Sequence, residues 1–487
     1  MLTSPTFNPQ DLLRFLPEII LTIAGTLLMV LDPILRKRSS SIFGHLTLLA
    51  LVTALGGALC ANANGGTAFG GMLSVDGFAT FFRVLVISVG ILVVFLSYRY
   101  LARQDAETSE YHALLLFSIT GQCVMAASND LIMVFIGLEI SSIASYVLAG
   151  YLRDDKRNNE AALKYFLLGS FATAFFLYGV ALIYGATGSV NLAVVRDAIQ
   201  HNGQVDPTFL GVAAALMFVG LGFKVSAAPF QIWAPDVYEG APAPVSAFLS
   251  AGPKAAAFAI FLRIFVTAFE PIGHRWEPLV WAAALASMCI GNFAALWQTN
   301  IKRMLAYSSI AHAGYVLVAL AARTDTGTAA AMFYLAAYAF MNVGAFACVS
   351  YLGGVHERFQ SIDDFKGLGR QQPLAAAMFS IFLFSLIGVP LTGGFFGKFY
   401  IFKAALESRL IWLTVLGLLN SAVAAYYYLR VLVMMYMHEP GDAARASEPM
   451  SPTARIALIL PALGTLLLGI FPTWVLDFAG KSAALVK

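Results

Sequence analysis

The stretch GLGFKVSAAPFQIWAPDVYEGAPAPVSAFLS, residues 220–250, is an apolar run that a helix cannot follow without interruption. Pro229 lacks a backbone donor and its ring clashes with the preceding turn, so a helix breaks near this position. Within a membrane such a break is tolerated only where protein or water satisfies the freed backbone groups. Lys224 lies five residues before the proline. The stretch therefore predicts a broken membrane helix that faces a polar interior.

A second stretch, LIGVPLTGGFFGKFYIFK at 386–403, carries related features. Pro390, followed by Gly393 and Gly394, predicts another break, and Lys398 lies eight residues after the proline. Two interrupted spans of this kind favour an internal repeat over a string of independent helices.

The composition places the whole chain in a membrane. Hydrophobic residues make up 59% of the 487 residues and charged residues 12%, whereas soluble domains hold roughly half and a quarter. The apolar residues fall in blocks of about 20, the length of a membrane-spanning helix, and not in the alternating pattern of a β-barrel. We therefore expect an all-α polytopic membrane protein with about fourteen transmembrane helices. They are predicted near 12–31, 42–62, 74–97, 112–128, 131–151, 161–186, 210–234, 241–268, 279–297, 302–322, 327–352, 374–402, 410–436 and 455–477.

Each interrupted span is the fourth helix of a predicted five-helix unit. Because five is odd, successive units enter the membrane from opposite sides, which is the inverted-repeat arrangement of many transporters. The predicted organisation is an N-terminal three-helix segment at 1–111, a first five-helix repeat at 112–268, a second, inverted five-helix repeat at 279–436, and a C-terminal loop with the last helix at 437–487.

Lysine and arginine set the expected orientation. Sixteen of them fall in one set of alternate loops, including the clusters at 36–38 and 153–157, and seven in the opposite loops and the C-terminal tail. The richer set is expected in the cytoplasm. With an even number of spans, both termini then face the periplasm of a bacterial inner membrane. The first apolar stretch is long enough to span and lacks the features of a cleavable signal, so we expect it to be retained.

Several kinds of ligand lack a matching sequence pattern. No basic stripe predicts nucleic-acid binding. No Rossmann or P-loop glycine pattern is present, and we expect no metal, nucleotide or redox centre on this chain. The cysteines are scattered singly, without the paired spacing of a zinc or iron–sulfur site, and are best interpreted as small core residues. They are Cys60, Cys123, Cys289 and Cys348.

Glu139, in FIGLEISSIASYVLAGY at 135–151, is a carboxylate about halfway along its predicted span. A charged side chain at such a depth costs about 2.5 to 3.5 kcal/mol, so it should face a partner or a wet cavity. Burial disfavours the charged form of the Lys224 amine, and a nearby carboxylate favours it. A pair of Glu139 and Lys224 would therefore change its proton affinity on separation. The alternatives are a protonated acid in a helix–helix hydrogen bond for Glu139 and a fixed structural ion pair for Lys224.

Three further titratable side chains lie deep in predicted spans. Lys254 is near the middle of the span that follows the first break, and Lys398 accompanies the second break. His312, in NIKRMLAYSSIAHAGYVLVAL at 300–320, lies near mid-membrane, with Lys302 at the cytoplasmic end of the same span. Histidine titrates near neutrality and both accepts and donates protons, so it suits a relay. A core histidine held by a backbone carbonyl is the alternative.

Other charged residues lie nearer to the ends of spans. Glu160 and Lys164 are one helical turn apart, which predicts an interfacial salt bridge, with a role in proton entry or coupling as the alternative. Anchors or packing pairs are expected from Glu18, Asp76, Arg83 and Arg263.

Together these residues resemble those of a known family, the antiporter-like proton-pumping membrane subunits of NADH:quinone oxidoreductase, respiratory complex I. The resemblance covers nearly the whole chain. The sequence PFQIWAPDVYEGAPAPVSAFLSAGPKAAAF at 229–258 is similar to the subunit N branch of the family, in which VYEGAPxPVxAF is a distinctive motif. Lys398 differs from the glutamate of the M branch. The chain also ends soon after its last predicted span, without the long lateral helix of the L branch.

The resemblance implies a role for each buried charge. Glu139 and Lys224 match the coupled pair of the family's fifth and seventh helices. Lys254 matches the central lysine of the eighth helix, and Lys398 the lysine near the periplasmic exit. Quinone reduction elsewhere would then separate the coupled pair and move protons from Lys224 by way of Lys254 to Lys398. Polar residues of lesser importance in the family match Glu160, Lys164, Lys302 and His312.

The resemblance also implies that the enzyme activity belongs to an assembled complex, with no redox chemistry on this chain. FMN, iron–sulfur clusters and quinone would be held by partner subunits. The expected partners are other complex I membrane subunits, namely M-like and K/J-like neighbours, together with the lipid bilayer.

Other functions share many of these features. A subunit of a multisubunit cation/proton antiporter or of a membrane-bound hydrogenase would have the same repeat and buried lysines, and only the wording at 229–258 and the length separate them. A stand-alone secondary transporter would also use broken helices, but its recognition groups should cluster at one pocket, whereas these lysines are spread along many helices. A membrane scaffold without transport is a third alternative.

Overall fold

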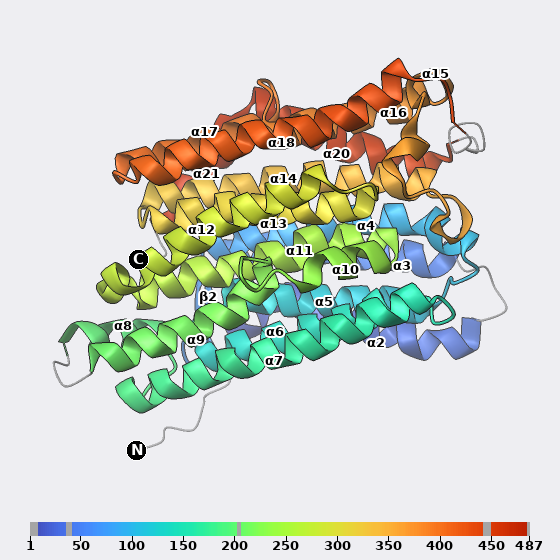
Figure 1. Ribbon diagram of the computed structural model, residues 1–487. Coiled ribbons are helices and arrows are strands. Elements are labelled where there is room, and N and C mark those ends of the chain that lie inside the picture. Colours follow the sequence, from blue (N-terminus) through green and yellow to red (C-terminus); the bar gives the residue numbers. More distant parts are fainter. Residues whose placement is uncertain (1–7, 36–40, 202–205, 442–449, 485–487) are drawn as a thin grey trace.

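The computed structural model describes residues 8–35, 41–201, 206–441 and 450–484, and most of them lie in helices that run side by side (Figure 1). Eleven helices in these ranges are long and apolar enough to cross a membrane. Each of the fourteen predicted spans overlaps a helix, so the all-α polytopic architecture is confirmed. The basic cluster at 36–38 and both chain ends, on which the predicted orientation partly depends, lie outside the described residues.

The N-terminal segment contains three long helices and a small antiparallel hairpin that the sequence did not predict. Each hairpin strand has three residues, too few to show an alternating pattern, and Gly66 is in register with Val75. The hairpin leads into a long helix whose first turn is capped, because the Asp76 side chain accepts a hydrogen bond from the N–H of Ala79 at 2.7 Å. The elements are α1 (Pro9–Arg14), α2 (Leu16–Leu35), α3 (Ser41–Ala63), β1 (Gly66–Ala68), β2 (Leu73–Val75) and α4 (Gly77–Arg103).

The next part of the chain includes the first interrupted span. The helix at 192–201 was not predicted, because it is a short amphipathic segment between two spans. The elements are α5 (Ser109–Ala127), α6 (Leu131–Ala149), α7 (Lys156–Thr187), α8 (Leu192–His201), α9 (Pro207–Val225), α10 (Trp233–Gly240) and α11 (Ala243–Leu262), which continues as a π-helical turn (Arg263–Ala268) and a 3-10 turn (Glu270–Ile272).

The remaining chain includes the second interrupted span and one corrected boundary. The span predicted at 455–477 is two helices, because Pro472 begins a new helix instead of continuing the old one. The elements are α12 (Gly273–Leu296), α13 (Ile301–Ala321), α14 (Asp325–Leu352), the 3-10 turns Val355–Glu357 and Ile362–Phe365, α15 (Leu368–Gln371), α16 (Pro373–Ile387), α17 (Gly393–Glu407), α18 (Ile411–Met437), α20 (Pro452–Ile470) and α21 (Pro472–Ala483).

The first break lies between α9 and α10, where Pro229 predicted it. Helix α9 ends at Val225, and Ser226 adopts a left-handed backbone conformation with φ of 60°. The carbonyl of Phe223, freed at the helix end, accepts hydrogen bonds from the N–H of Ser226 at 3.0 Å and from the indole of Trp233 at 2.8 Å. Protein groups therefore satisfy this end of the broken helix.

The second break lies between α16 and α17. Gly388 ends α16 with φ of 95°, a conformation that favours glycine. A larger residue there would also meet Lys398, whose Cδ would lie 3.3 Å from a Cβ at position 388. On the other side of the break, the N–H of Gly394 donates to Ser385 Oγ at 3.1 Å. Both interruptions that the sequence predicted are therefore present.

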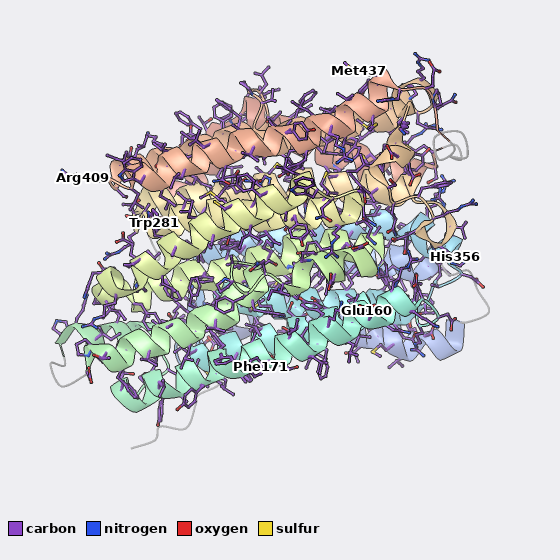
Figure 2. All side chains as sticks on the ribbon, viewed as in Figure 1. Glu160, Phe171, Trp281, His356, Arg409 and Met437 are labelled. Carbon is purple, nitrogen blue, oxygen red and sulfur yellow. The ribbon has the colours of Figure 1, made fainter. Side chains whose placement is uncertain are left out.

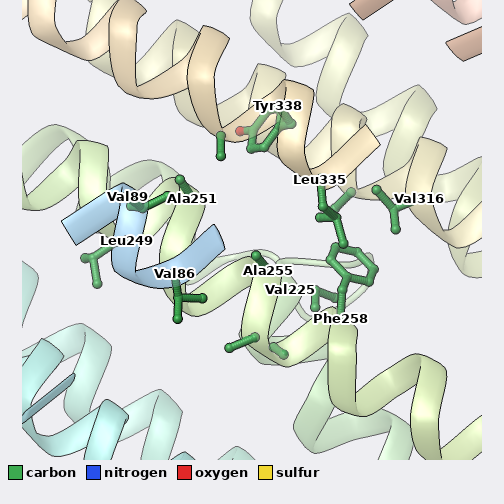
Figure 3. Close-up of a cluster of buried hydrophobic side chains, with 14 of the residues drawn as sticks. Val86, Val89, Val225, Leu249, Ala251, Ala255, Phe258, Val316, Leu335 and Tyr338 are labelled. Atoms are coloured by element: carbon green, nitrogen blue, oxygen red, sulfur yellow. The ribbon is translucent and has the colours of Figure 1, made fainter. Parts of the chain in front are cut away.

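Helices α11, α13 and α14 form the centre of the bundle. In the most apolar window of each, between 94% and 100% of the residues are buried, against 39% in α7 and α18. Figure 3 shows apolar side chains of α4, α11, α13 and α14 packed together in this centre. The outer helices instead project large apolar side chains outward, such as Phe171 of α7 in Figure 2. Charged side chains predicted at mid-membrane in the central helices are therefore enclosed by protein.

Candidate functional site

Lys254 lies in the most buried helix, α11, and reaches a neighbouring helix of the centre. Its Nζ donates to the carbonyl of Ser309 in α13 at 3.0 Å and also to the Ser309 hydroxyl. The residue before it, Pro253, has no N–H to donate to the carbonyl of Leu249, and the Tyr238 hydroxyl donates to that carbonyl at 3.3 Å. The proline thus opens the backbone of α11 to polar side chains beside the lysine.

His312 lies one turn after Ser309 in α13 and contacts two tyrosines through its two ring nitrogens. Nδ1 lies 2.5 Å from the hydroxyl of Tyr334, and Nε2 lies 3.2 Å from the hydroxyl of Tyr428. The Tyr428 hydroxyl is also hydrogen-bonded to Ser308. A core histidine held by a backbone carbonyl was the alternative interpretation, and the structure gives these ring nitrogens tyrosine hydroxyls as neighbours instead.

Two other tyrosines connect the histidine to the lysines on either side. The Tyr338 ring lies 5.9 Å from Lys254 Nζ and 5.2 Å from the His312 ring. The Tyr315 ring lies 5.5 Å from the His312 ring and 5.0 Å from Lys398 Nζ. A lysine ammonium is attracted to the face of an aromatic ring at such distances. Lys254, His312 and Lys398 therefore form one line, in which a tyrosine lies between successive members.

Lys398 projects from α17 back toward the end of α16. Its Nζ donates to the carbonyls of Leu386 and Ile387 and to Ser421 Oγ, each at 2.9 Å. The two carbonyls are free because the helix ends there, and the C-terminal end of a helix attracts cations. A cavity of about 620 Å³ between α17 and α18 is lined by apolar side chains and by the polar residues Lys398, Lys403, Glu407, Thr414 and Ser421. The second break therefore provides the partners of this lysine.

Lys224 lies in the last turn of α9, at the first break. Its Nζ lies 5.0 Å from the ring of Tyr146 and 5.2 Å from the ring of Tyr165. Among the described residues, no ion pair within 4.0 Å joins Lys224 to Glu139. Glu139 is half-buried in α6, two turns before Tyr146 and on the same face. The two predicted partners thus lie on α6 and α9, with the Tyr146 ring of α6 beside the lysine, and they are not a contact pair.

The predicted salt bridge between Glu160 and Lys164 is present, and it belongs to a larger network. Lys164 Nζ lies 2.7 Å from Glu160 Oε1 and 2.7 Å from Asp236 Oδ2 in α10. Asp236 also binds Arg303 of α13 at 2.7 Å, and Arg303 binds Glu239 at 2.8 Å. The network connects α7, α10 and α13 beside the first break.

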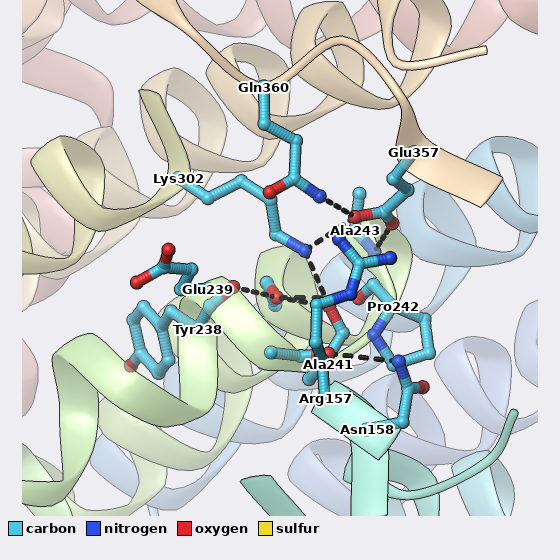
Figure 4. A network of polar contacts seen from close by, with 12 residues as sticks. Arg157, Asn158, Tyr238, Glu239, Ala241, Pro242, Ala243, Lys302, Glu357 and Gln360 are labelled. Carbon is cyan, nitrogen blue, oxygen red and sulfur yellow. Dashed lines mark hydrogen bonds and ion pairs between the residues drawn. The ribbon is translucent and has the colours of Figure 1, made fainter. Parts of the chain in front are cut away.

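Lys302, at the start of α13, is fully buried and makes an ion pair. Its Nζ lies 2.7 Å from Glu357 Oε2 and donates to the carbonyl of Ala241 at 2.6 Å (Figure 4). Glu357 Oε1 accepts a hydrogen bond from the N–H of Ala243, the first residue of α11, at 2.6 Å. Lys302 thus has a carboxylate partner that the sequence reasoning did not identify.

The expected packing pairs are also formed. Glu18 and Arg83 are fully buried and lie 2.7 Å apart between α2 and α4. Asp76 and Arg263 lie 3.0 Å apart and connect the start of α4 to the end of α11. The two pairs tie the N-terminal helices to each other and to the centre of the bundle.

The sequence did not predict the role of the tyrosines that lie beside His312 and beside the three lysines. These lysines are Lys224, Lys254 and Lys398. A buried tyrosine costs little once its hydroxyl finds a partner, so it carries no signal of the kind that a buried charge gives. Their spacing relative to the charges was the available signal, because Tyr315 follows His312 by three residues and Tyr146 follows Glu139 by seven. The tyrosines around these side chains are Tyr146, Tyr165, Tyr238, Tyr315, Tyr334, Tyr338 and Tyr428.

Known proteins resemble this chain across the same central helices. The family described as NADH:quinone oxidoreductase/Mrp antiporter, TM, matches residues 128–424, which include both breaks and every buried lysine from Lys224 to Lys398. The chain belongs to this family. A relative from Solibacter usitatus, named NADH-quinone oxidoreductase subunit N 1, is 80% identical over 487 residues, the whole of both chains.

Two solved structures show how far the fold extends within the family. A chain of respiratory complex I from Thermus thermophilus with bound aureothin is 35% identical, with a TM-score of 0.82 over 95% of this chain and 99% of that one. A chain of the Mrp complex from Dietzia sp. DQ12-45-1b is 22% identical, with a TM-score of 0.84 over 99% of this chain and 98% of that one. The second likeness shows a shared fold alone.

Proposed function

We propose that this chain is a proton-translocating membrane subunit of NADH:quinone oxidoreductase, in which quinone reduction elsewhere in the complex drives proton transfer through buried Glu, Lys and His side chains. The observation that carries the proposal is the line Lys254, His312 and Lys398, in which the rings of Tyr338 and Tyr315 lie between successive members and His312 contacts the hydroxyls of Tyr334 and Tyr428. Amines and imidazole gain and lose protons, and hydroxyl groups pass protons between them. The named relative at 80% identity supports this assembly as the setting.

Each member of the path has a proposed role. Glu139 and Lys224 form the switch, because a change in their separation alters the charge that Lys224 can hold. Lys254 receives the proton at the centre of the membrane, and His312 relays it. Lys398 releases it, because its amine faces a cavity at the second break. Secondary roles belong to Lys302, Glu160 and Lys164. They lie near the start of α13, at the end of the bundle where the loops are richest in lysine and arginine.

The surroundings of the chain follow from the same proposal. The loops rich in lysine and arginine face the cytoplasm, both termini face the periplasm of a bacterial inner membrane, and the units 112–268 and 279–436 form an inverted pair. Other membrane subunits, M-like and K/J-like, cover its flanks together with lipid. FMN, iron–sulfur clusters and quinone belong to partner subunits, and electrons do not enter this chain.

A cation/proton antiporter subunit is the competing function, because an Mrp-complex chain has the same fold. The proposal prefers the oxidoreductase since an 80% identical relative carries that name. The two differ in assembly. Affinity purification of the tagged chain from its native membrane should recover an NADH-oxidising complex, and recovery of a complex without that activity would favour the antiporter.

The mechanism is tested by Lys254→Met, which keeps the length of the side chain and removes the amine. We expect NADH oxidation by the assembled complex to pump fewer protons per electron, because loss of a positioned proton-transfer group slows transfer through this chain by about a hundredfold or more. The matched control is Lys481→Met, at an exposed lysine of α21. Unchanged pumping in the assembled Lys254→Met complex would show that the line does not carry the protons.

A further inference from the structure

A large polar cavity opens between the C-terminal end of α4, the N-terminal end of α7 and the loop after α14. Its volume is about 870 Å³, and its walls include loop residues at 104–110 and 151–158. Three of the wall residues are lysine or arginine, at 153, 156 and 157, so the cavity lies on the side that the charge distribution assigns to the cytoplasm. None of the lysines at the two breaks or in α11 lines it.

Glu357 lies where this cavity ends. It is one of the lining residues, yet only 8% exposed. Its backbone and that of His356 have φ of 49° and 54°, a left-handed conformation that is uncommon outside glycine. Two such residues in succession turn the chain so that the carboxylate points inward, beneath the loop (Figure 4). Strain of this kind persists only where the surrounding structure holds it, and it is frequent at functional sites.

The carboxylate of Glu357 accepts hydrogen bonds from groups on its inner side. Oε2 accepts from Lys302 Nζ at 2.7 Å and from Gln360 Nε2 at 2.9 Å, and Oε1 accepts from the N–H of Ala243 at 2.6 Å. Beside it, Arg157 donates to the carbonyl of His356 at 3.3 Å and holds the loop in place. Glu357 therefore connects the cavity wall directly to the starts of α11 and α13.

These two helices carry the centre of the proposed path. Lys302 and Ser309 are both in α13, seven residues apart, which is a rise of about 10 Å along the helix. Between them, Lys302 Nζ donates to the carbonyl of Ala241, and Ser246 Oγ lies 3.4 Å from that carbonyl and 2.7 Å from the carbonyl of Tyr238. Tyr238 in turn donates to α11 beside Lys254. Polar groups therefore lie near both ends of the stretch between Glu357 and Lys254, with the ring of Tyr238 between its carbonyl and its hydroxyl.

Another buried ion pair of the chain provides a comparison. The side chains of Glu18 and Arg83 are both fully buried. Among the described residues, neither lines the cavity beside Glu357 or the one beside Lys398. In Glu357–Lys302 the lysine has no exposure, whereas the carboxylate forms part of the cavity wall. This pair thus has an outer member and an inner member, which a purely structural pair does not need.

We propose that Glu357 is the proton-uptake residue of this chain and that the cavity above it is the cytoplasmic inlet. The inference rests on the proposed function. Lys302, as the ammonium, gives one proton to a water molecule on its inner side, toward the Ser246 hydroxyl, which leaves a hydronium ion there and a neutral amine whose nitrogen keeps the electron pair. Glu357, having taken one proton from hydronium in the cavity, passes it to that nitrogen. The carboxylate–ammonium pair is restored, and one proton has moved from the cavity to the inner side of Lys302.

The test uses the assembled complex in inverted membrane vesicles, whose outer solution reaches the cytoplasmic face. NADH starts the reaction, and a potential-sensitive dye reports charge moved per NADH oxidised. We expect Glu357→Ala to lower this ratio to that of the Lys254→Met complex, because proton transfer through this chain slows by about a hundredfold. Formate in the outer solution should restore most of the ratio, because it replaces the missing carboxylate beside Lys302. Glu357→Asp should retain most of the ratio. Asp154→Asn, at an exposed carboxylate of the same cavity, should equal wild type.

Several outcomes would overturn the inlet. A Glu357→Ala complex that pumps like wild type, or one whose defect formate does not relieve while Glu357→Asp is equally defective, gives Glu357 a structural role only. If neither Glu357 variant assembles, Lys156→Cys at the cavity wall decides, through labelling with a bulky impermeant maleimide. Slower pumping after labelling supports the inlet, and unchanged pumping excludes it.

Failure of the inlet and failure of the proposed function are distinguishable in the same assay. Lys254→Met pumping at the wild-type ratio would sink the proposed function, whatever Glu357 does. A defective Lys254→Met beside a normal Glu357→Ala would leave the function in place and move the entry point elsewhere.

Discussion

Lys398 of α17 donates hydrogen bonds of 2.9 Å to the carbonyls of Leu386 and Ile387 in α16, so the two halves of one broken helix form a single binding site for an amine. In an unbroken helix these carbonyls would be occupied by backbone N–H groups. The break therefore creates acceptors at the depth where the lysine needs them. Gly388 allows the close approach, since a Cβ at that position would touch the lysine side chain.

The first prediction concerns this site. Lys398→Met removes three hydrogen bonds and the charge, and we expect the assembled complex to pump fewer protons per electron, because transfer through this chain slows by about a hundredfold or more. Lys481→Met is the matched control, because Lys481 is an exposed lysine of α21 and does not line the cavity beside Lys398. Measurement of dye-reported proton uptake against NADH oxidation compares the two. Equal ratios in both variants would remove Lys398 from the path.

The second prediction separates two neighbouring tyrosines of α18. Tyr428 lies 3.2 Å from His312 Nε2, whereas Tyr427 donates to Asn292 at 3.1 Å. Both are buried, so Tyr→Phe leaves similar buried polar groups without a partner, at a cost of about 1–3 kcal/mol each. We expect Tyr428→Phe to slow proton pumping and Tyr427→Phe to affect stability alone.

Paired measurements distinguish these effects. Thermal stability of each purified complex should fall to a similar extent, and the pumping ratio should fall only in Tyr428→Phe. A normal ratio in that variant would make His312 a structural residue, held by tyrosine instead of a carbonyl.

The broken helices and the buried charges were predictable from sequence because each carries a large local cost. A proline within an apolar span, or a lysine far from the membrane surface, has few structural explanations. Lys224, Lys254 and Lys398 were found in this way. The separation of Lys224 from Glu139 was not predictable, because residues of two helices can be assigned to one level of the membrane without the distance between them being known.

The remaining parts of the site depend on tertiary packing. Glu357 lies in the polar loop after α14, where an acidic residue is ordinary. Only the fold brings its carboxylate to Lys302 at the start of α13. Asp236 lies in the fold-deciding stretch itself, yet its partners Lys164 and Arg303 are about seventy residues away on either side. The boundary after α20 was placed too late, because the apolar residues Trp474, Val475 and Leu476 continue the apolar run past Pro472 and only the fold shows the turn.

The last prediction tests whether a buried charge pair outside the line is structural. Glu18 and Arg83 have no exposure, and neither lines the larger cavities that the described residues form. Arg83→Met leaves an unpaired buried carboxylate and should destabilise the chain by about 3–5 kcal/mol, whereas replacing both residues by apolar ones should restore stability. Thermal unfolding of the purified complex and the yield of assembled complex measure this difference.

The pumping ratio completes the test, because a structural pair and a transferring pair differ there. Glu18→Leu combined with Arg83→Met should assemble and pump as many protons per electron as wild type, since no step of the proposed path passes through either side chain. An assembled double variant with a lower ratio would extend the path into the N-terminal helices. That result would also remove Glu18–Arg83 as the structural counterpart of Glu357–Lys302.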